Sequence, residues 1–244
     1  MNSFLIVIPG YNEEQNIAKV LTGILAQNLP ADILVVDDGS LDKTAQIASS
    51  YPVTVISHPY NLGYGAALQT GYKYATAKGY QFVLQFDGDG QHDPINLVNL
   101  IAELQKGGVD IVIGSRYLEG GTSFQTGAAK KVGVQFFRRM IQTTTGLKIS
   151  DPTSGLRGIS AAVFNYYAVR DRFPADFPDA DMLIEQIFRD YRIREIPAHM
   201  RHREAGVSMH AGLKPILYMM KVSLAICVVL LQSKLTKRGA KHAS

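Results

Sequence analysis

Residues 82–93, FVLQFDGDGQHD, carry the pattern on which the prediction of the fold rests. A short apolar run (82–86) ends in a turn that holds two carboxylates, Asp87 and Asp89, on either side of Gly88. An apolar run without polar alternation is typical of a strand covered on both faces, as in a parallel sheet. Polar residues directly after such a strand are expected at the carboxyl edge of the sheet, where open α/β folds bind ligands.

The first half of the chain repeats this arrangement. We expect strands at 4–8, 33–36, 53–57, 82–86 and 110–113, and helices at 13–26, 63–77 and 94–105. Asn12, Asp42 and Asp93 stand where helix caps belong. The polar motifs fall at strand ends: residues 11–13, 37–40, 87–92 and 115–117. The sequence therefore predicts an α/β fold with a mostly parallel sheet flanked by helices.

The length of 244 residues suits one α/β domain with an appendage, which we place at 1–210 and 211–244. Residues 215–235 are mainly apolar, but their longest charge-free run (222–231) is ten residues, against about 20 for a spanning helix. We expect this segment to lie in a membrane interface or to pack on the core. A helix at 130–145 sets Val132, Phe136, Phe137 and Met140 beside four cations, as interfacial helices do.

Composition narrows the class of protein. The net charge is +4, but no nucleic-acid motif occurs and the acidic motifs would repel a polyanion. The basic clusters are either solvated helix faces or contacts to phosphates and an anionic leaflet. The single cysteine, Cys227, fits a reducing compartment, and the apolar start of the chain is predicted to be a strand rather than a signal peptide.

The acidic turn favours a divalent cation. Two carboxylates directly after a buried strand are hard oxygen ligands that suit Mg²⁺ or Mn²⁺, although Asp93 is expected to cap a helix instead. The motif at 37–40 either accepts hydrogen bonds from a base or ribose or forms a capped turn. Gly63 and Gly65 open a helix whose amides could approach phosphate. Leu68 stands where a dinucleotide fingerprint needs its third glycine, so a nicotinamide dehydrogenase is disfavoured.

Four motifs together resemble family-2 glycosyltransferases of the GT-A fold: IPGYNEE (8–14), VVDDGSLDKT (35–44), NLGYGA (61–66) and DGDGQH (87–92). Their order and spacing match over about the first 120 residues. Two later motifs, GSRY (114–117) and DPTSGLR (151–157), are similar to the polyprenyl-phosphate branch of that family.

The resemblance implies a role for each matching residue. Those expected around the nucleoside are Pro9, Tyr11, Glu13 and Asp38, and those at the metal and sugar diphosphate are Asp87, Asp89 and Gln91. Arg116 is expected to face the acceptor phosphate, with Lys131, Arg157 and Arg203 as further candidates. Asp181 stands roughly where relatives keep a catalytic base, or else caps a helix; a sugar-hydroxyl acceptor would need such a base, Asp181 or Asp151.

We therefore expect an inverting transfer from a UDP- or GDP-linked sugar to an undecaprenyl or dolichyl phosphate at the cytoplasmic face of the cell membrane. A small integral membrane protein or a second copy of the chain is a plausible partner. The alternatives are transfer to a saccharide in polysaccharide synthesis, and a non-catalytic nucleotide-sugar-binding subunit, against which the Asp87/Asp89 pair argues. A nucleotidyltransferase is disfavoured because the first strand is not followed by a basic glycine-rich loop.

Overall fold

The computed structural model describes residues 2–120, 128–174 and 180–201, together with Leu224 and Val228. The chain separates into two compact units, each of which is described by itself. The first holds the described residues of 1–125, 154–178 and 192–206, and the second those of 126–153, 179–191 and 207–244. The predicted C-terminal helix and tail (211–244) lie outside the described residues, apart from Leu224 and Val228.

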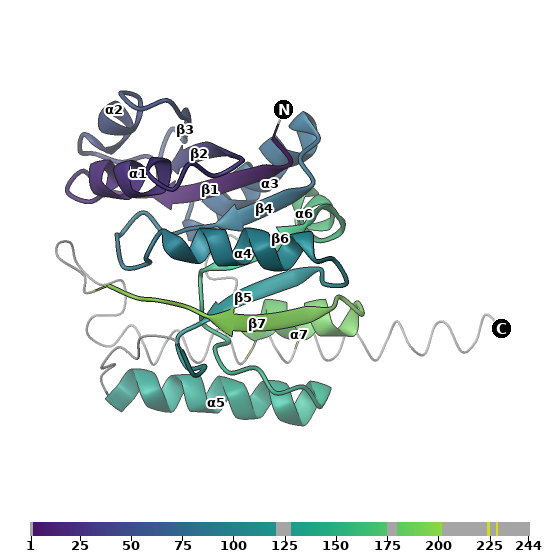
Figure 1. Cartoon of the computed structure of the whole chain (residues 1–244). Helices are drawn as coiled ribbons and strands as arrows, with labels where there is room; N and C mark the ends of the chain where they lie inside the picture. The colour runs from purple at the N-terminus through teal and green to yellow at the C-terminus, as the bar shows by residue number, and fades with distance from the viewer. Residues whose placement is uncertain (1, 121–127, 175–179, 202–223, 225–227, 229–244) are drawn as a thin grey trace. The chain divides into compact units, whose positions relative to one another are not determined.

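The first unit is built around a seven-stranded sheet in the order β3-β2-β1-β4-β6-β5-β7 (Figure 1). Six strands run parallel and β6 runs antiparallel to its neighbours β4 and β5, so the predicted mostly parallel sheet is confirmed. The strands are β1 (Phe4–Gly10), β2 (Ala31–Asp37), β3 (Thr54–Ser57), β4 (Phe82–Gln85), β5 (Ile111–Ser115), β6 (Arg157–Ser160) and β7 (Ile193–Pro197). Because β6 is reversed, its first residue lies at the edge where the other strands end.

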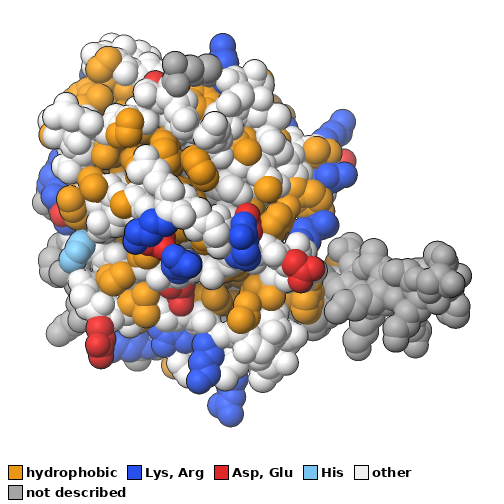
Figure 2. All heavy atoms as spheres, turned by 45° about the vertical axis from the view of Figure 1, so that its right-hand side comes forward, with side chains coloured by type: hydrophobic (Ala, Val, Ile, Leu, Met, Phe, Trp, Pro, Cys, Tyr) orange, Lys and Arg blue, Asp and Glu red, His pale blue; other side chains and the backbone are white. Residues whose placement is uncertain are grey.

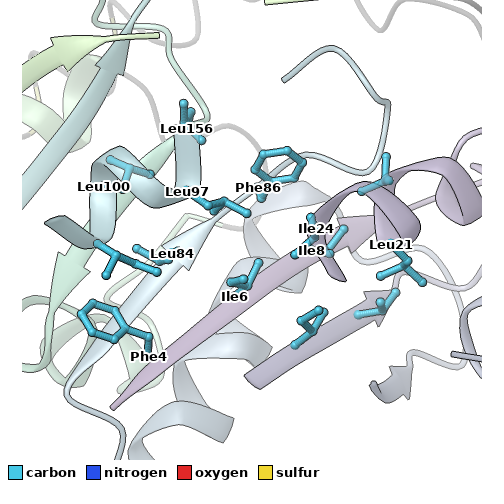
Figure 3. Packing of buried hydrophobic residues seen from close by; sticks show 14 of the residues in the cluster. Phe4, Ile6, Ile8, Leu21, Ile24, Leu84, Phe86, Leu97, Leu100 and Leu156 are labelled. Carbon is cyan, nitrogen blue, oxygen red and sulfur yellow. The ribbon is translucent and has the colours of Figure 1, made fainter. Parts of the chain in front are cut away.

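Helices cover both faces of this sheet, which explains the continuous apolar runs. On one face α1 and α4 place Leu21, Ile24, Leu97 and Leu100 against alternate residues of β1 and β4 (Figure 3). On the other face lie α3 and α6, which pack against each other. The helices of this unit are α1 (Ile17–Leu25), α2 (Thr44–Ala48), α3 (Tyr64–Lys78), α4 (Ile95–Gln105) and α6 (Ala161–Ala168).

The chain departs from the predicted elements at four places. Helix α1 begins at Ile17 rather than at residue 13, and Asn12 does not cap it, because the Asn12 side chain accepts a hydrogen bond from the Leu41 amide instead. Strand β1 continues through Pro9 instead of ending at residue 8. Proline has no N–H to donate, but Pro9 lies beyond the last residue of β1 that pairs with β4 (Val7 with Gln85), so no hydrogen bond to β4 is lost. Helix α6 and strand β7 were not predicted.

The second unit contains α5 (Ala128–Thr145) and α7 (Ala180–Phe188), which pack against each other. In α5, Val134, Phe137 and Ile141 are buried at helical spacing, whereas Val132 and Phe136 are 65% and 39% exposed. Phe137 therefore does not belong to the exposed face that was predicted to be interfacial, whereas Val132 and Phe136 are exposed. Among the described residues, no helix is both long and apolar enough to cross a membrane.

Charged and apolar side chains are mixed on the surface. Figure 2 shows one face on which Lys and Arg side chains lie singly or in small groups, between apolar side chains and next to acidic ones.

The contact between α3 and β1 generates a prediction about stability. Gly71 of α3 lies so close to β1 that a Cβ would overlap the two methyl groups of Val7, a fully buried residue. Gly71→Ala should lower the free energy of unfolding by about 1–3 kcal/mol, although alanine favours helices, because overpacking costs more than the propensity gains. Urea unfolding followed by circular dichroism measures this. An unchanged or higher stability would contradict the close packing.

Candidate functional site

The predicted polar motifs meet at the carboxyl edge of the sheet, and two glycines allow the loops to touch. A Cβ on Gly88 would lie 3.1 Å from the Pro9 carbonyl oxygen, so the acidic turn after β4 lies directly beside the end of β1. Gly39 has a φ of +69°, and a Cβ there would lie 2.7 Å from the Tyr60 Cα. The loop after β2 therefore packs backbone to backbone against the loop that leads into α3.

Hydrogen bonds join the first motif to the second. The Asn12 amide donates to Ser40 Oγ and the Leu41 amide donates to Asn12 Oδ1, each at 2.9 Å. The Glu13 amide donates to Thr44 Oγ1 at 2.8 Å. These contacts explain why Asn12 takes a φ of 55°, a conformation that asparagine tolerates. Tyr11, directly before Asn12, is 43% exposed and can reach a ligand.

Asp38 is buried and its carboxylate is fully used by the protein. Oδ1 accepts from the Leu62 amide at 2.9 Å and lies 2.7 Å from His58 Nδ1, while Oδ2 accepts from the Gly63 amide at 2.9 Å. His58 Nε2 lies 2.9 Å from Thr70 Oγ1 of α3. The predicted nucleoside residue Asp38 thus also anchors the start of α3, where Gly63 and Gly65 lie as predicted.

The acidic turn contains a carboxylate with a protein donor on each oxygen. Tyr64 Oη donates to Asp87 Oδ1 at 2.9 Å, and His92 Nε2 lies 3.3 Å from Asp87 Oδ2. Burial raises the pKa of Asp87, but the contacts with His92 and Tyr64 and the nearby Arg116 guanidinium outweigh it and hold the pKa below its usual value. Burial and the adjacent Asp87 raise the pKa of Tyr64, which keeps its hydroxyl a donor.

The rest of the turn is tied to the chain after β7. Asp89 Oδ1 accepts from the Gln91 amide at 3.0 Å. The Arg201 amide donates to the Gln91 carbonyl at 2.7 Å, and Arg201 Nε donates to Asp93 Oδ2 at 2.9 Å. Asp93 also accepts from the Ile95 amide at 3.1 Å, so its predicted capping role is confirmed.

The donors of this turn fit a divalent cation. Mg²⁺ is usually held by one or two carboxylates together with substrate phosphates and water, and Mn²⁺ prefers the same oxygen ligands. Asp87 and Asp89 supply two carboxylates, Gln91 adds an amide oxygen, and the lowered pKa of Asp87 keeps that carboxyl in its charged form. In the described part of the chain, no three His, Cys, Asp or Glu side chains are grouped as a metal site.

Two of the predicted phosphate-binding residues lie in the first unit. Arg116 follows β5, with its guanidinium 5.8 Å from the centroid of the Tyr117 ring. Arg157 begins β6 and is only 5% exposed, and its Nε donates to the Ser154 carbonyl at 2.9 Å. Because Arg157 is buried, its positive charge acts on neighbouring groups at the carboxyl edge, among them Tyr64. Its contact with an acceptor phosphate stays a prediction.

The remaining predicted residues lie outside the described part of the first unit. Lys131 is an exposed residue of α5 in the second unit, and Arg203 lies outside the described residues. Asp151 and Asp181 also belong to the second unit. Asp151 is fully buried, and Asp181 stands in the first turn of α7 with 8% exposure. Their proposed role as a base stays a prediction.

Four residues of the site were missed by the sequence analysis. Tyr64 and His92 lie inside quoted motifs, between two glycines and after the metal residues respectively, but were given no role. His58 precedes the third motif without a signal of its own. Gly155 lies within DPTSGLR, and a Cβ there would meet Asp87 Oδ2 at 2.8 Å and Tyr64 Oη at 3.1 Å.

Comparison with known proteins places these motifs in a family. The model of glycosyl transferase family 2 matches residues 5–168. The chain is 29% identical over 215 residues to polyprenol monophosphomannose synthase of Mycolicibacterium smegmatis, covering 85% of this chain and 81% of that protein. It is 30% identical over 222 residues to undecaprenyl-phosphate mannosyltransferase of Micrococcus luteus, covering 85% and 87%. The match spans 65% and 45% of the length of two other relatives.

Among solved structures, the fold is similar to that of glucosyl-3-phosphoglycerate synthase from Mycobacterium tuberculosis in complex with Mn²⁺ and UDP-glucose. The TM-score is 0.70 at 20% identity, over 95% of this chain and 79% of that chain. This likeness supports the predicted GT-A arrangement of the sheet.

The Asp38 network generates a prediction that needs no ligand. Asp38→Asn would turn an NH₂ group toward one of the N–H donors that the carboxylate now accepts from, so the free energy of unfolding should fall by about 1–3 kcal/mol. The measurement is urea unfolding without nucleotide. Asp171→Asn is the matched control, because Asp171 is 88% exposed and asparagine tolerates its φ of 62°. Equal stability of Asp38→Asn and the parent would limit Asp38 to ligand binding.

Proposed function

Because the chain belongs to glycosyl transferase family 2, we propose that it transfers a sugar from a nucleoside diphosphate sugar to a polyprenyl phosphate. The observation that carries the proposal is the acidic turn of Asp87 and Asp89, which lies at the carboxyl edge beside the end of β1. Two relatives that match more than four fifths of this chain are named polyprenol monophosphomannose synthase and undecaprenyl-phosphate mannosyltransferase. The class of acceptor rests on these names.

The donor is proposed to bind across the first three motifs. Tyr11 is exposed at the end of β1 and can contact the nucleoside beside Pro9, Glu13 and the loop that Asp38 anchors. The Gly63 amide is already bound to Asp38, so of the two glycines Gly65, in the first turn of α3, is proposed to offer its amide to the diphosphate. The first turn of a helix leaves N–H groups without partners in the helix. A bound Mg²⁺ or Mn²⁺, held by Asp87, Asp89 and Gln91, would offset negative charge on the leaving diphosphate.

In the proposed reaction an oxygen of the acceptor phosphate forms a bond to the anomeric carbon. The bond between that carbon and the diphosphate oxygen breaks, and its electron pair stays on the nucleoside diphosphate. Attack from the face opposite the leaving group inverts the anomeric configuration. Among the described residues of the first unit, Arg116 is proposed to place its positively charged guanidinium at the phosphates, because its charge already acts on Asp87.

A phosphate acceptor would not need a general base at the carboxyl edge. The second pKa of a phosphate monoester is about 6, so the acceptor is already an anion and a nucleophile at neutral pH. A sugar hydroxyl would instead need a base such as Asp181 or Asp151. The saccharide alternative therefore depends on such a carboxylate, whereas the polyprenyl phosphate proposal does not.

A lipid acceptor also implies work at a membrane surface, and we propose the cytoplasmic face. The support is the exposed part of α5, where Val132 and Phe136 lie next to Lys131 and Arg139, which are also exposed. Apolar side chains beside cations suit the boundary between acyl chains and anionic headgroups. A small membrane protein or a second copy of the chain remains a proposed partner.

The proposal predicts metal-dependent transfer into lipid. Radiolabelled UDP- and GDP-sugars are supplied with polyprenyl phosphate and Mn²⁺ or Mg²⁺, and label is counted in the organic phase. Transfer should occur with one of the donors, should disappear on addition of a chelator, and should fall roughly 10²-fold or more in Asp89→Asn, because charge at the diphosphate is no longer balanced.

Asp93→Asn is the matched control, since Asp93 lies in the same loop but caps α4 and binds Arg201. It should retain most activity. Donor hydrolysis that depends on Asp89 and metal, without label in lipid from any donor, would keep the transferase and overturn the polyprenyl phosphate acceptor.

A further inference from the structure

We propose that Tyr64 and His92 are positioning residues that together hold the Asp87 carboxylate in one orientation toward the metal and sugar diphosphate. Gly155 provides the space that this arrangement needs. The inference rests on the proposed function, because it concerns how the donor site is held rather than which sugar or acceptor is used.

The geometry gives each oxygen of Asp87 its own donor. Tyr64 Oη lies 2.9 Å from Oδ1, and His92 Nε2 lies 3.3 Å from Oδ2. Rotation of the carboxylate about its Cβ–Cγ bond would break or weaken both contacts together. The remaining lone pairs of the Asp87 carboxylate therefore keep a fixed direction. Residues that hydrogen-bond to metal ligands orient those ligands in this way.

Tyr64 is itself fixed by the network of Asp38. The Asp38 carboxylate accepts from the amides of Leu62 and Gly63, the two residues immediately before Tyr64. Tyr64 is the first residue of α3, so the anchored start of the helix sets the position from which its side chain reaches Asp87. The nucleoside side and the metal side of the site are in this way connected through one short segment.

His92 has one directed polar contact in the described part of the chain. It is 6% exposed and lies against the Phe86 ring, with the ring centroids 5.8 Å apart. Its Nδ1 is buried and has no hydrogen-bond partner among the described residues, so Nε2 is the nitrogen that serves the site. Residues 92 and 200 also form an isolated bridge, which fixes the backbone that carries the imidazole.

Gly155 closes the arrangement from the side of β6. A Cβ at this position would lie 2.8 Å from Asp87 Oδ2 and 3.1 Å from Tyr64 Oη, with Asp87 Oδ1 at 3.2 Å. A side chain there would have to displace the carboxylate from its two donors. The glycine is thus explained by close approach alone, because no unusual φ is required.

The test measures metal affinity rather than turnover. Free Mn²⁺ is followed by electron paramagnetic resonance while the intact protein is titrated with Mn²⁺ in the presence of UDP and, separately, of GDP. Tyr64→Phe removes the hydroxyl donor and keeps the ring, and His92→Phe removes the nitrogen donor and puts a larger planar ring in place of the imidazole. Each should weaken Mn²⁺ binding about 10- to 100-fold, the range found when partners of metal ligands are lost.

Two further variants separate positioning from general stability. His92→Gln can place a side-chain N–H near the position of Nε2 and should restore part of the affinity that His92→Phe loses. Tyr80→Phe is the matched control, because Tyr80 Oη also donates to an aspartate, Asp32 Oδ2, at 2.8 Å, at the amino ends of the strands. It should leave Mn²⁺ affinity unchanged. Gly155→Ala should weaken binding as the Phe variants do.

The outcomes distinguish this inference from the proposed function. If the parent protein fails to bind Mn²⁺ both in the presence of UDP and in the presence of GDP, the proposed donor site and the role of Tyr64 and His92 are both overturned. If the parent binds Mn²⁺ while Tyr64→Phe and His92→Phe bind it equally well, only the positioning role is overturned. If His92→Phe does not fold, Tyr64→Phe and Gly155→Ala still decide the matter, since an unchanged Mn²⁺ affinity in both would contradict the proposal.

Discussion

Burial of the sheet on both faces is the constraint from which the rest of the structure follows. Successive side chains of β1 point to opposite faces of the sheet, and each face is covered by helices. Ile6 and Ile8 face α1 and α4, and Val7 faces Gly71 of α3. A polar side chain in these strands would be buried without water, which is costly unless it finds a partner. Polar groups therefore gather where the strands end, and the reversed strand β6 adds residues 154–157 to the same edge.

At that edge the loops approach each other more closely than side chains would permit. Gly39, Gly88 and Gly155 each occupy a position where a Cβ would press on a neighbouring loop or on the Asp87 carboxylate. The resulting contacts let a few acceptors organise several segments, since Asp38 fixes the start of α3 and Asp87 receives donors from two different segments. Rigid placement of charge before the ligand arrives is what electrostatic stabilisation of a leaving diphosphate requires.

The sequence was informative wherever burial left a regular pattern. The apolar runs located β1 to β5, and the strand ends located the acidic turn, because two-sided burial removes polar alternation. Strand β7 was missed because it is an edge strand whose residues IREIP mix charge with apolar side chains. The start of α1 was predicted too early, because the Asn12 side chain does not cap the helix but accepts a hydrogen bond from Leu41, 29 residues further along the chain. Tyr64, His92 and Gly155 could not be predicted, because their roles depend on distances between loops.

The central claim is that the turn of Asp87 and Asp89 holds the metal and the sugar diphosphate. Crystals of the protein grown with Mn²⁺ and a nucleoside diphosphate, measured at the manganese absorption edge, test it most directly. The account predicts one anomalous peak in contact with carboxylate oxygens of this turn, next to the diphosphate, with Tyr64 and His92 still bonded to Asp87. A peak bound elsewhere, or a diphosphate seated away from this edge, would contradict it.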